Sequence, residues 1–233
     1  MEVQIGAAKV AKYATRESGD TLEIIERPHG GISAVLVDGQ RSGLSAKIIS
    51  NIVARKAISL LGEGVRDGAV ARATHDYLRT HRRGQVSAEL QVVSVDLATN
   101  SVVISRNTQS PAVISQGGQL RFFDAPSQPI GIYANTKPVI LELPLQADTY
   151  VAVFTDGLTV AEDMAGHAVD PGLMVRRAAE KRRPAQELAD DLLASALAAE
   201  QGRPRDDISV LVLAVLPNEI PGRIRRLSAS FPV

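Results

Sequence analysis

The middle of this chain, from about residue 88 to residue 154, consists of short apolar runs separated by turn signals, without helical periodicity. Asn100-Ser101 and Gly117-Gly118 are typical of hairpin turns, and we expect a turn near Ala147-Asp148 to pair the last two runs. Because tight hairpins join antiparallel strands, this stretch favours antiparallel sheets over strand–helix–strand units. The expected strands are Ala88–Asp96, Val102–Arg106, Ala112–Ser115, Leu120–Phe123, Val139–Leu143 and Tyr150–Phe154.

Helical periodicity is found on both sides of this segment. Apolar residues recur at helical spacing from Leu44 to Leu61, a second helix is expected over residues 66–81, and a third over 185–200, after Pro184. We expect the residues between 157 and 183 to form a turn-rich insertion with short helices. Further strands are expected within residues 2–14, as a hairpin over 20–38, and at Ile208–Leu216, whose apolar character throughout is typical of a central strand. The fold class is therefore α+β.

Composition excludes several classes of function. The 233 residues include no Cys, which rules out disulfides, thiolate zinc sites and cysteine nucleophiles. Lys plus Arg and Asp plus Glu both number 26, and this balance argues against a dedicated nucleic-acid binder. Charged residues interrupt the first apolar stretch, and no apolar run is long enough to cross a bilayer. We therefore expect a cytoplasmic protein that has no nucleic-acid or membrane partner.

Four aspartates lie at the ends of strand-like runs. Asp38 and Asp156 each follow an apolar run and precede Gly, Asp20 follows Ser18-Gly19, and Asp206 precedes the last strand. Each motif alone is more typical of a turn, because Asp bonds its own backbone and Gly accepts positive φ. Together, carboxylates that project from strand ends can converge on a hard divalent cation, and all-oxygen ligands favour magnesium or manganese over zinc. The sequence thus predicts a metal site that can activate water against a phosphate ester.

The order of these motifs resembles the metal-dependent serine/threonine phosphatases of the 2C class, and most of all their bacterial SpoIIE branch, which includes small stand-alone members. The resemblance runs from about residue 15 to residue 216, so we expect a phosphatase domain over 1–216 and a C-terminal tail over 217–233. It is carried by Ser18-Gly19-Asp20, Val37-Asp38-Gly39-Gln40-Arg41-Ser42-Gly43-Leu44-Ser45-Ala46, Gln128-Pro129-Ile130-Gly131, Phe154-Thr155-Asp156-Gly157-Leu158 and Arg205-Asp206-Asp207-Ile208-Ser209-Val210.

The resemblance implies two packed antiparallel sheets flanked by helices, an αββα sandwich, with two Mn²⁺ or Mg²⁺ ions at one edge. Asp38 would bridge both ions, the carbonyl of Gly39 would bind one, and Asp156 and Asp206 would complete the shell of the second. Asp20 would hold metal-bound water from the outer shell, so that Asp20 and Asp38 are the expected catalytic residues. Asp207 ranks below Asp206, because relatives carry Asn or Asp at its position.

The chain departs from the family pattern at one place. Many relatives have a histidine shortly after the bridging aspartate that is a candidate proton donor, and here Gln40 and Arg41 follow Gly39. The general acid is therefore left unassigned. Arg16, four residues before Asp20, and Arg41, beside the metal loop, are the expected substrate-binding residues, with a surface arginine as the alternative for each.

The resemblance implies a phosphorylated regulatory protein as substrate, either an anti-sigma antagonist or a stressosome protein with the STAS fold. Two alternatives stay open: a catalytically degenerate binding module, motivated by the missing histidine, and a hydrolase of small phosphoesters. The basic residues between Arg176 and Arg183 are expected on a solvated helix face, with partner contact as the alternative. The histidines have no metal-ligand spacing and are all expected at the surface or in turns: His29, His75, His81 and His167.

Overall fold

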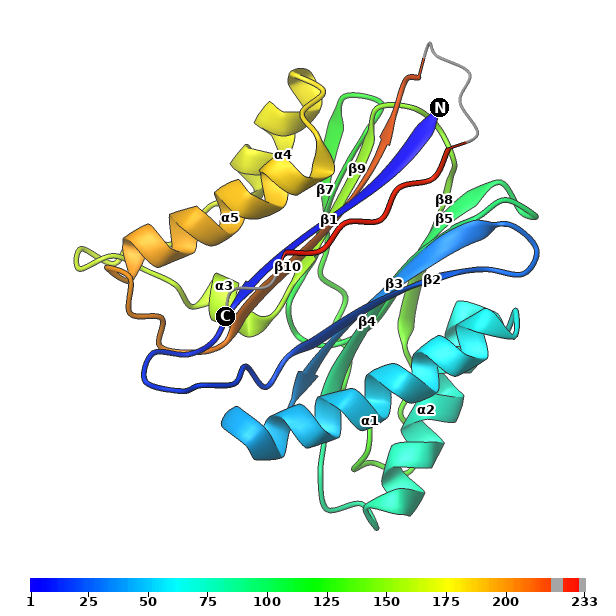
Figure 1. Ribbon diagram of the computed structural model, residues 1–233, viewed down its shortest axis with the longest axis vertical. Coiled ribbons are helices and arrows are strands. Elements are labelled where there is room, and N and C mark those ends of the chain that lie inside the picture. Colours follow the sequence, from blue (N-terminus) through cyan, green and yellow to red (C-terminus); the bar gives the residue numbers. More distant parts are fainter. Residues whose placement is uncertain (219–223, 231–233) are drawn as a thin grey trace.

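The computed structural model describes residues 1–218 and 224–230, which form four layers with two antiparallel sheets in the middle. Helices α4 and α5 cover the outer face of one sheet, and α1 and α2 cover the outer face of the other (Figure 1). This is the αββα sandwich that the sequence analysis predicted.

Each sheet has five strands within the described residues. The first has the order β1-β10-β9-β6-β7, and the second has the order β2-β3-β4-β5-β8. Every pair of neighbouring strands is antiparallel. The strands of the first sheet are β1 (Glu2–Val10), β6 (Ala112–Gln116), β7 (Gln119–Phe123), β9 (Thr149–Phe154) and β10 (Ile208–Leu216), and those of the second are β2 (Thr21–Glu26), β3 (Gly31–Gly39), β4 (Ala88–Asp96), β5 (Ser101–Asn107) and β8 (Val139–Pro144).

The three helices that the sequence pattern predicted are α1, α2 and α5 of the structure. The helices of the described residues are α1 (Gly43–Gly62), α2 (Asp67–His81), α3 (Asp156–Thr159), α4 (Pro171–Glu180) and α5 (Ala185–Ala199). The predicted insertion over residues 157–183 contains most of α3 and all of α4. No element is assigned to the described residues of the tail, 217–218 and 224–230, and the boundary at 216 stays a prediction.

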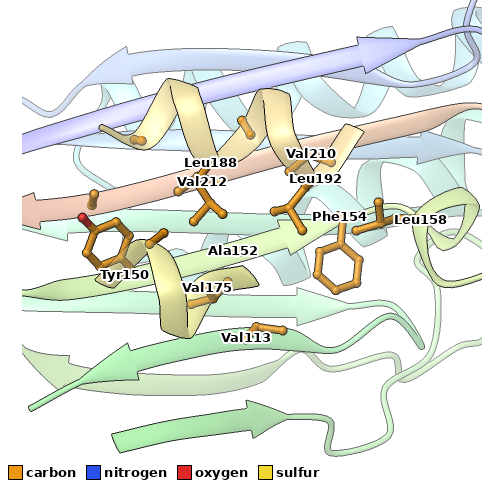
Figure 2. Packing of buried hydrophobic residues seen from close by; sticks show 14 of the residues in the cluster. Val113, Tyr150, Ala152, Phe154, Leu158, Val175, Leu188, Leu192, Val210 and Val212 are labelled. Atoms are coloured by element: carbon orange, nitrogen blue, oxygen red, sulfur yellow. The ribbon is translucent and has the colours of Figure 1, made fainter. Parts of the chain in front are cut away.

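Strand β10 shows why the core divides into layers. All nine of its residues are buried, as expected for a strand that is covered on both faces. Because successive side chains point to opposite faces, Val210 and Val212 pack against α5 while Leu211 and Leu213 pack against the other sheet. Figure 2 shows the first of these layers, where Leu188 and Leu192 of α5 lie over β10 and β9. A third cluster packs α1 and α2 on the second sheet.

One predicted pairing is wrong. The runs at 139–143 and 150–154 do not pair through a turn near Ala147-Asp148, because β8 pairs with β5 while β9 pairs with β10 and β6. The short connection carries the chain from one sheet to the other, and Leu145 within it is buried in the layer between the sheets. Two apolar runs joined by a short turn are compatible with a hairpin in one sheet and also with strands in two stacked sheets, because stacked sheets bury their facing apolar residues. Among the described residues, none of the helices combines the length and apolar character needed to cross a bilayer.

Candidate metal and active site

The four predicted aspartates come together at one end of the sandwich, and each sheet contributes two of them. Asp38 is the next-to-last residue of β3, and Asp20 directly precedes β2, the partner of β3. Asp156 follows the end of β9, and Asp206 precedes β10, which pairs with β9. In Figure 1 the start of α1, the helix α3 and the start of β10 lie at this same end. Antiparallel pairing therefore brings carboxylates that are distant in sequence to one edge.

A cleft of about 370 Å³ opens at this edge. Asp38, Asp156 and Asp206 line it, together with a fourth carboxylate that the sequence analysis missed, Glu89. Glu89 is the residue of β4 directly opposite Asp38, and it accepts hydrogen bonds from the Thr108 hydroxyl and the Gln109 amide. The remaining lining residues are Lys12, Gln40, Arg41, Ser42, Ser87, Ala88 and Pro129.

Asp38 is the electrostatic centre of the cleft. Burial, followed by repulsion from Asp20, Asp156, Glu89 and Asp206, raises the pKa of Asp38 to about 9. Burial and the charge of Asp206 also raise the pKa of Asp156. The cleft therefore brings several carboxylates so close together that the ionised forms of Asp38 and Asp156 are disfavoured.

Asp20 is completely buried and does not line the cleft. Its Oδ2 accepts hydrogen bonds from the Ser209 hydroxyl at 2.6 Å and the Thr155 hydroxyl at 3.2 Å. Its Oδ1 has no hydrogen-bond partner within the described part of the chain. Burial raises the pKa of Asp20 to about 6, against the opposing effect of the bond from Ser209. A fixed carboxylate behind the cleft suits the predicted outer-shell role.

The residues of the cleft fit divalent cations. The donors are all oxygen, the buried Oδ1 of Asp20 is unsatisfied, and the carboxylates repel one another in the absence of a cation. Across the described residues, no three acidic or histidine side chains lie in an arrangement that could hold a metal ion as they stand. Asp38, Asp156 and Asp206 stay the predicted ligands, and the fit rests on charge and donor type.

Asp207 has a different role from its neighbour Asp206. Its Oδ1 accepts a hydrogen bond from the Lys12 amide at 2.9 Å, and its Oδ2 accepts one from the Gly19 amide at 2.8 Å. Both carboxylate oxygens are therefore used to hold the loop between β1 and β2. Asp206 lines the cleft whereas Asp207 does not.

The two predicted substrate-binding arginines differ in position. Arg41 lines the cleft, whereas Arg16 is exposed and does not. Lys12, which the sequence analysis did not select, lines the cleft in its place. Gln40, at the place where many relatives have histidine, is bonded through its side-chain oxygen to the Ser87 amide at 3.1 Å. Its amide thus fixes the end of β3 to the residue before β4.

The surface prediction for the histidines is wrong for His75. This side chain is buried on α2, and its Nδ1 accepts a hydrogen bond from the Gly131 amide at 3.0 Å. His75 therefore supports the segment Gln128-Pro129-Ile130-Gly131, whose Pro129 lines the cleft. His29, His81 and His167 are exposed as predicted, and so are Arg176, Arg177 and Lys181 of the basic segment.

Gly39 is needed for close packing as well as being a predicted carbonyl ligand. A Cβ atom at this position would lie 2.1 Å from the Ala46 carbonyl oxygen on α1. Gly157, after Asp156, has a similar environment, because its Cβ would lie 2.2 Å from the Asp207 carbonyl oxygen. Both Asp-Gly steps are therefore places where two backbones approach each other beside the cleft.

We expect Gly39→Ala to lower the free energy of unfolding by about 2 kcal/mol, because α1 must move away from the end of β3. Gly62→Ala, at the end of α1, is the control: its Cβ would meet only the Ile25 side chain, at 3.7 Å. Urea unfolding of both variants measures the difference. A Gly39→Ala variant as stable as Gly62→Ala would contradict the packing explanation.

Comparisons with known proteins identify the family and the fold of this chain. The family described as "Stage II sporulation protein E (SpoIIE)" matches residues 28–216. The chain belongs to the SpoIIE family. Stage II sporulation protein E of Bacillus subtilis is 24% identical over 215 residues, which cover 91% of this chain and 26% of that protein. The Priestia megaterium protein is 21% identical over 218 residues, covering 93% and 37%. This SpoIIE-family chain therefore spans only between about a quarter and somewhat more than a third of the length of these relatives.

Solved structures confirm the fold of this SpoIIE-family chain. The PP2C phosphatase domain of SpoIIE from Bacillus subtilis, solved with a fragment of its regulatory domain, has a TM-score of 0.79 and 24% identity, and the match covers 94% of this chain and 64% of that one. RsbX in complex with magnesium has a TM-score of 0.71 and 11% identity, covering 91% and 94%. The serine/threonine phosphatase PstP of Mycobacterium tuberculosis has a TM-score of 0.69 and 13% identity, covering 93% and 100%.

Proposed function

We propose that this chain is a metal-dependent phosphatase that removes phosphate from serine or threonine of a protein. The observation that carries this proposal is the convergence of Asp38, Asp156 and Asp206 from both sheets in one cleft of about 370 Å³, where burial, followed by repulsion from the neighbouring carboxylates, raises the pKa of Asp38 to about 9. The presence of Lys12 and Arg41 in the same cleft supports a phosphate as the bound group.

The proposed ligands of two Mn²⁺ or Mg²⁺ ions are the carboxylates of Asp38, Asp156 and Asp206 and the carbonyl of Gly39. RsbX, which has the same fold, was solved with magnesium. When bound, such ions supply an activated water and neutralise the charge of the phosphoryl group.

The side chains of this chain have separate tasks in the proposed reaction. Lys12 and Arg41 bind the phosphate oxygens, and Arg16 stays a weaker candidate because it lies outside the cleft. Asp20 presents its free Oδ1 toward water behind the ligands, and its orientation is fixed by Ser209 and Thr155. Gln40 has no titratable proton and is bonded to Ser87, so it does not replace the missing histidine as an acid.

The proposed substrate is a phosphorylated bacterial signalling regulator, with anti-sigma antagonists and stressosome proteins of the STAS fold as the first candidates. The relatives support this class of substrate: the chain resembles RsbX and a structure that contains the RsbU and RsbW domains of a Mycobacterium tuberculosis protein. A further solved structure with the same fold belongs to a study of the bacterial stressosome.

Phosphate release tests this function. We expect release from a phosphoserine peptide and from p-nitrophenyl phosphate in the presence of manganese, and none after chelation with EDTA. Turnover of nucleotides in preference to phosphoprotein would favour the alternative hydrolase of small phosphoesters. The degenerate binding module is motivated by Gln40, and calorimetric titration with manganese distinguishes it. A module that has lost its ions would show no manganese binding, and catalysis would exclude it.

A further inference from the structure

The loop between β1 and β2, residues 11–20, is hydrogen-bonded to the segment that precedes β10, residues 204–207. The Tyr13 amide donates to the Pro204 carbonyl oxygen at 2.8 Å, in addition to the two bonds that Asp207 accepts from Lys12 and Gly19. Pro204 and Asp207 are both buried, so these bonds are shielded from competing water. The loop therefore presents its side chains in fixed positions beside the cleft.

Tyr13 of this loop lies beside Arg203, which belongs to the segment between α5 and β10. The Arg203 guanidinium lies 5.4 Å from the centre of the Tyr13 ring, and the Tyr13 residue is 56% exposed. Tyr and Arg are the residue types that most often supply binding energy at protein interfaces. Because the pair is already stacked, a partner that binds it would lose little side-chain entropy.

The charges around this pair are free to act on a ligand. Lys12, Arg16 and Arg203 form no ion pair within the described residues, whereas the nearby Arg205 is paired with Glu200 and Glu162. Lys12 lines the cleft, but Tyr13 and Arg203 lie outside it. The positive groups thus extend from the cleft to the surface beside it, and they favour an anionic ligand that is larger than a single phosphate.

We propose that Lys12, Tyr13 and Arg203 form a docking surface for the acidic polypeptide that flanks a phosphorylated serine or threonine. Lys12 contacts the phosphate in the cleft, the Tyr13 ring packs against the chain beside it, and Arg203 pairs with a neighbouring carboxylate. This inference rests on the proposed phosphatase function and adds a substrate class, phosphoproteins with acidic residues next to the phosphate.

Steady-state kinetics with two substrates test the docking surface. We expect Arg203→Glu and Tyr13→Ala to lower kcat/KM about tenfold for a phosphoserine peptide with aspartates on both sides. The same variants should stay within about twofold of the wild type on p-nitrophenyl phosphate, which is too small to reach Arg203. Arg176→Glu is the matched control, because Arg176 is an exposed arginine on α4, and it should change neither rate.

A binding measurement keeps the inference testable without turnover. Fluorescence anisotropy with the same labelled acidic phosphopeptide should show Arg203→Glu binding about tenfold more weakly than wild type and Arg176→Glu. Equal losses on both substrates, or unchanged peptide binding, would overturn the docking surface. If wild type with manganese releases no phosphate from any substrate, the proposed function is wrong, and the anisotropy result still decides the docking surface.

Discussion

Replacing Asp38 by Asn is expected to reduce kcat/KM for phosphoserine peptide and p-nitrophenyl phosphate about 10³-fold, a loss of about 4 kcal/mol of transition-state stabilisation. The substitution keeps the size of the side chain and removes the charge on which the cleft depends. Asp38 is the carboxylate whose pKa responds to all the others around it, namely Asp20, Asp156, Glu89 and Asp206. Losing it should therefore weaken metal binding as well as the rate.

Two controls separate this effect from misfolding. Asp190→Asn changes an exposed aspartate on α5 and should leave the rate unchanged. Calorimetric titration of Asp38→Asn with manganese should show a weaker affinity than wild type. An Asp38→Asn enzyme that kept more than about a tenth of the wild-type kcat/KM would show that the bridging role belongs to another residue.

The fold was predictable wherever the pattern was local. Apolar periodicity located α1, α2 and α5, and turn dipeptides located the β4–β5 and β6–β7 hairpins. The continuous apolar run of β10 identified a strand that is covered on both faces. The pairing of β8 with β5 was not predictable, because it depends on strands that lie far apart in sequence and on which sheet each run joins.

The site was predictable in part for the same reason. Aspartates beside strand ends carry a local signal, and all four lie at one edge of the sandwich. Glu89 carries no such signal, because only the register of β4 against β3 shows that it faces Asp38. His75 did have a signal that was overlooked: it shares a helical stripe with Val70, Ala71, Thr74 and Leu78, all of which are buried.

Asp206 and Asp207 illustrate what adjacency cannot decide. Both precede β10, and their order in the sequence does not say which of the two side chains faces the cleft. In the structure Asp206 lines the cleft, whereas both carboxylate oxygens of Asp207 accept hydrogen bonds from the loop of residues 11–20. Lys12, which lines the cleft, belongs to that loop. The buried carboxylate of Asp207 therefore fixes the position of the Lys12 backbone through a hydrogen bond.

The crowding that suits the site for cations should destabilise the protein when metal is removed. The pKa is about 9 for Asp38 and about 6 for Asp20 in the folded protein, against 3.8 for an ordinary aspartate. At a pH between 3.8 and the raised pKa, each of these carboxyls keeps its proton in the folded protein but has released it in the unfolded chain. The free energy of unfolding must therefore fall as the pH rises through this range. Lys47, whose pKa burial lowers to about 8, begins to oppose this trend only above that pH.

In EDTA, the free energy of unfolding of wild type is therefore expected to fall by about 5 kcal/mol from about pH 5 to about pH 8, at about 1.4 kcal/mol per unit of pH for each proton. Asp38 contributes most of this fall across the whole range, and Asp20 contributes only up to its pKa of about 6. Asp38→Asn cannot ionise at this position, so its stability should change less over the same range and exceed that of wild type at the upper end. Urea unfolding at each pH measures both slopes, and manganese should restore most stability to wild type at the upper end, where the ligands bind as carboxylates. A wild-type protein whose metal-free stability stayed constant or rose over this range would mean that burial and mutual repulsion do not raise the pKa values of these carboxyls. The strongest physical support for a metal centre in this cleft would then be lost.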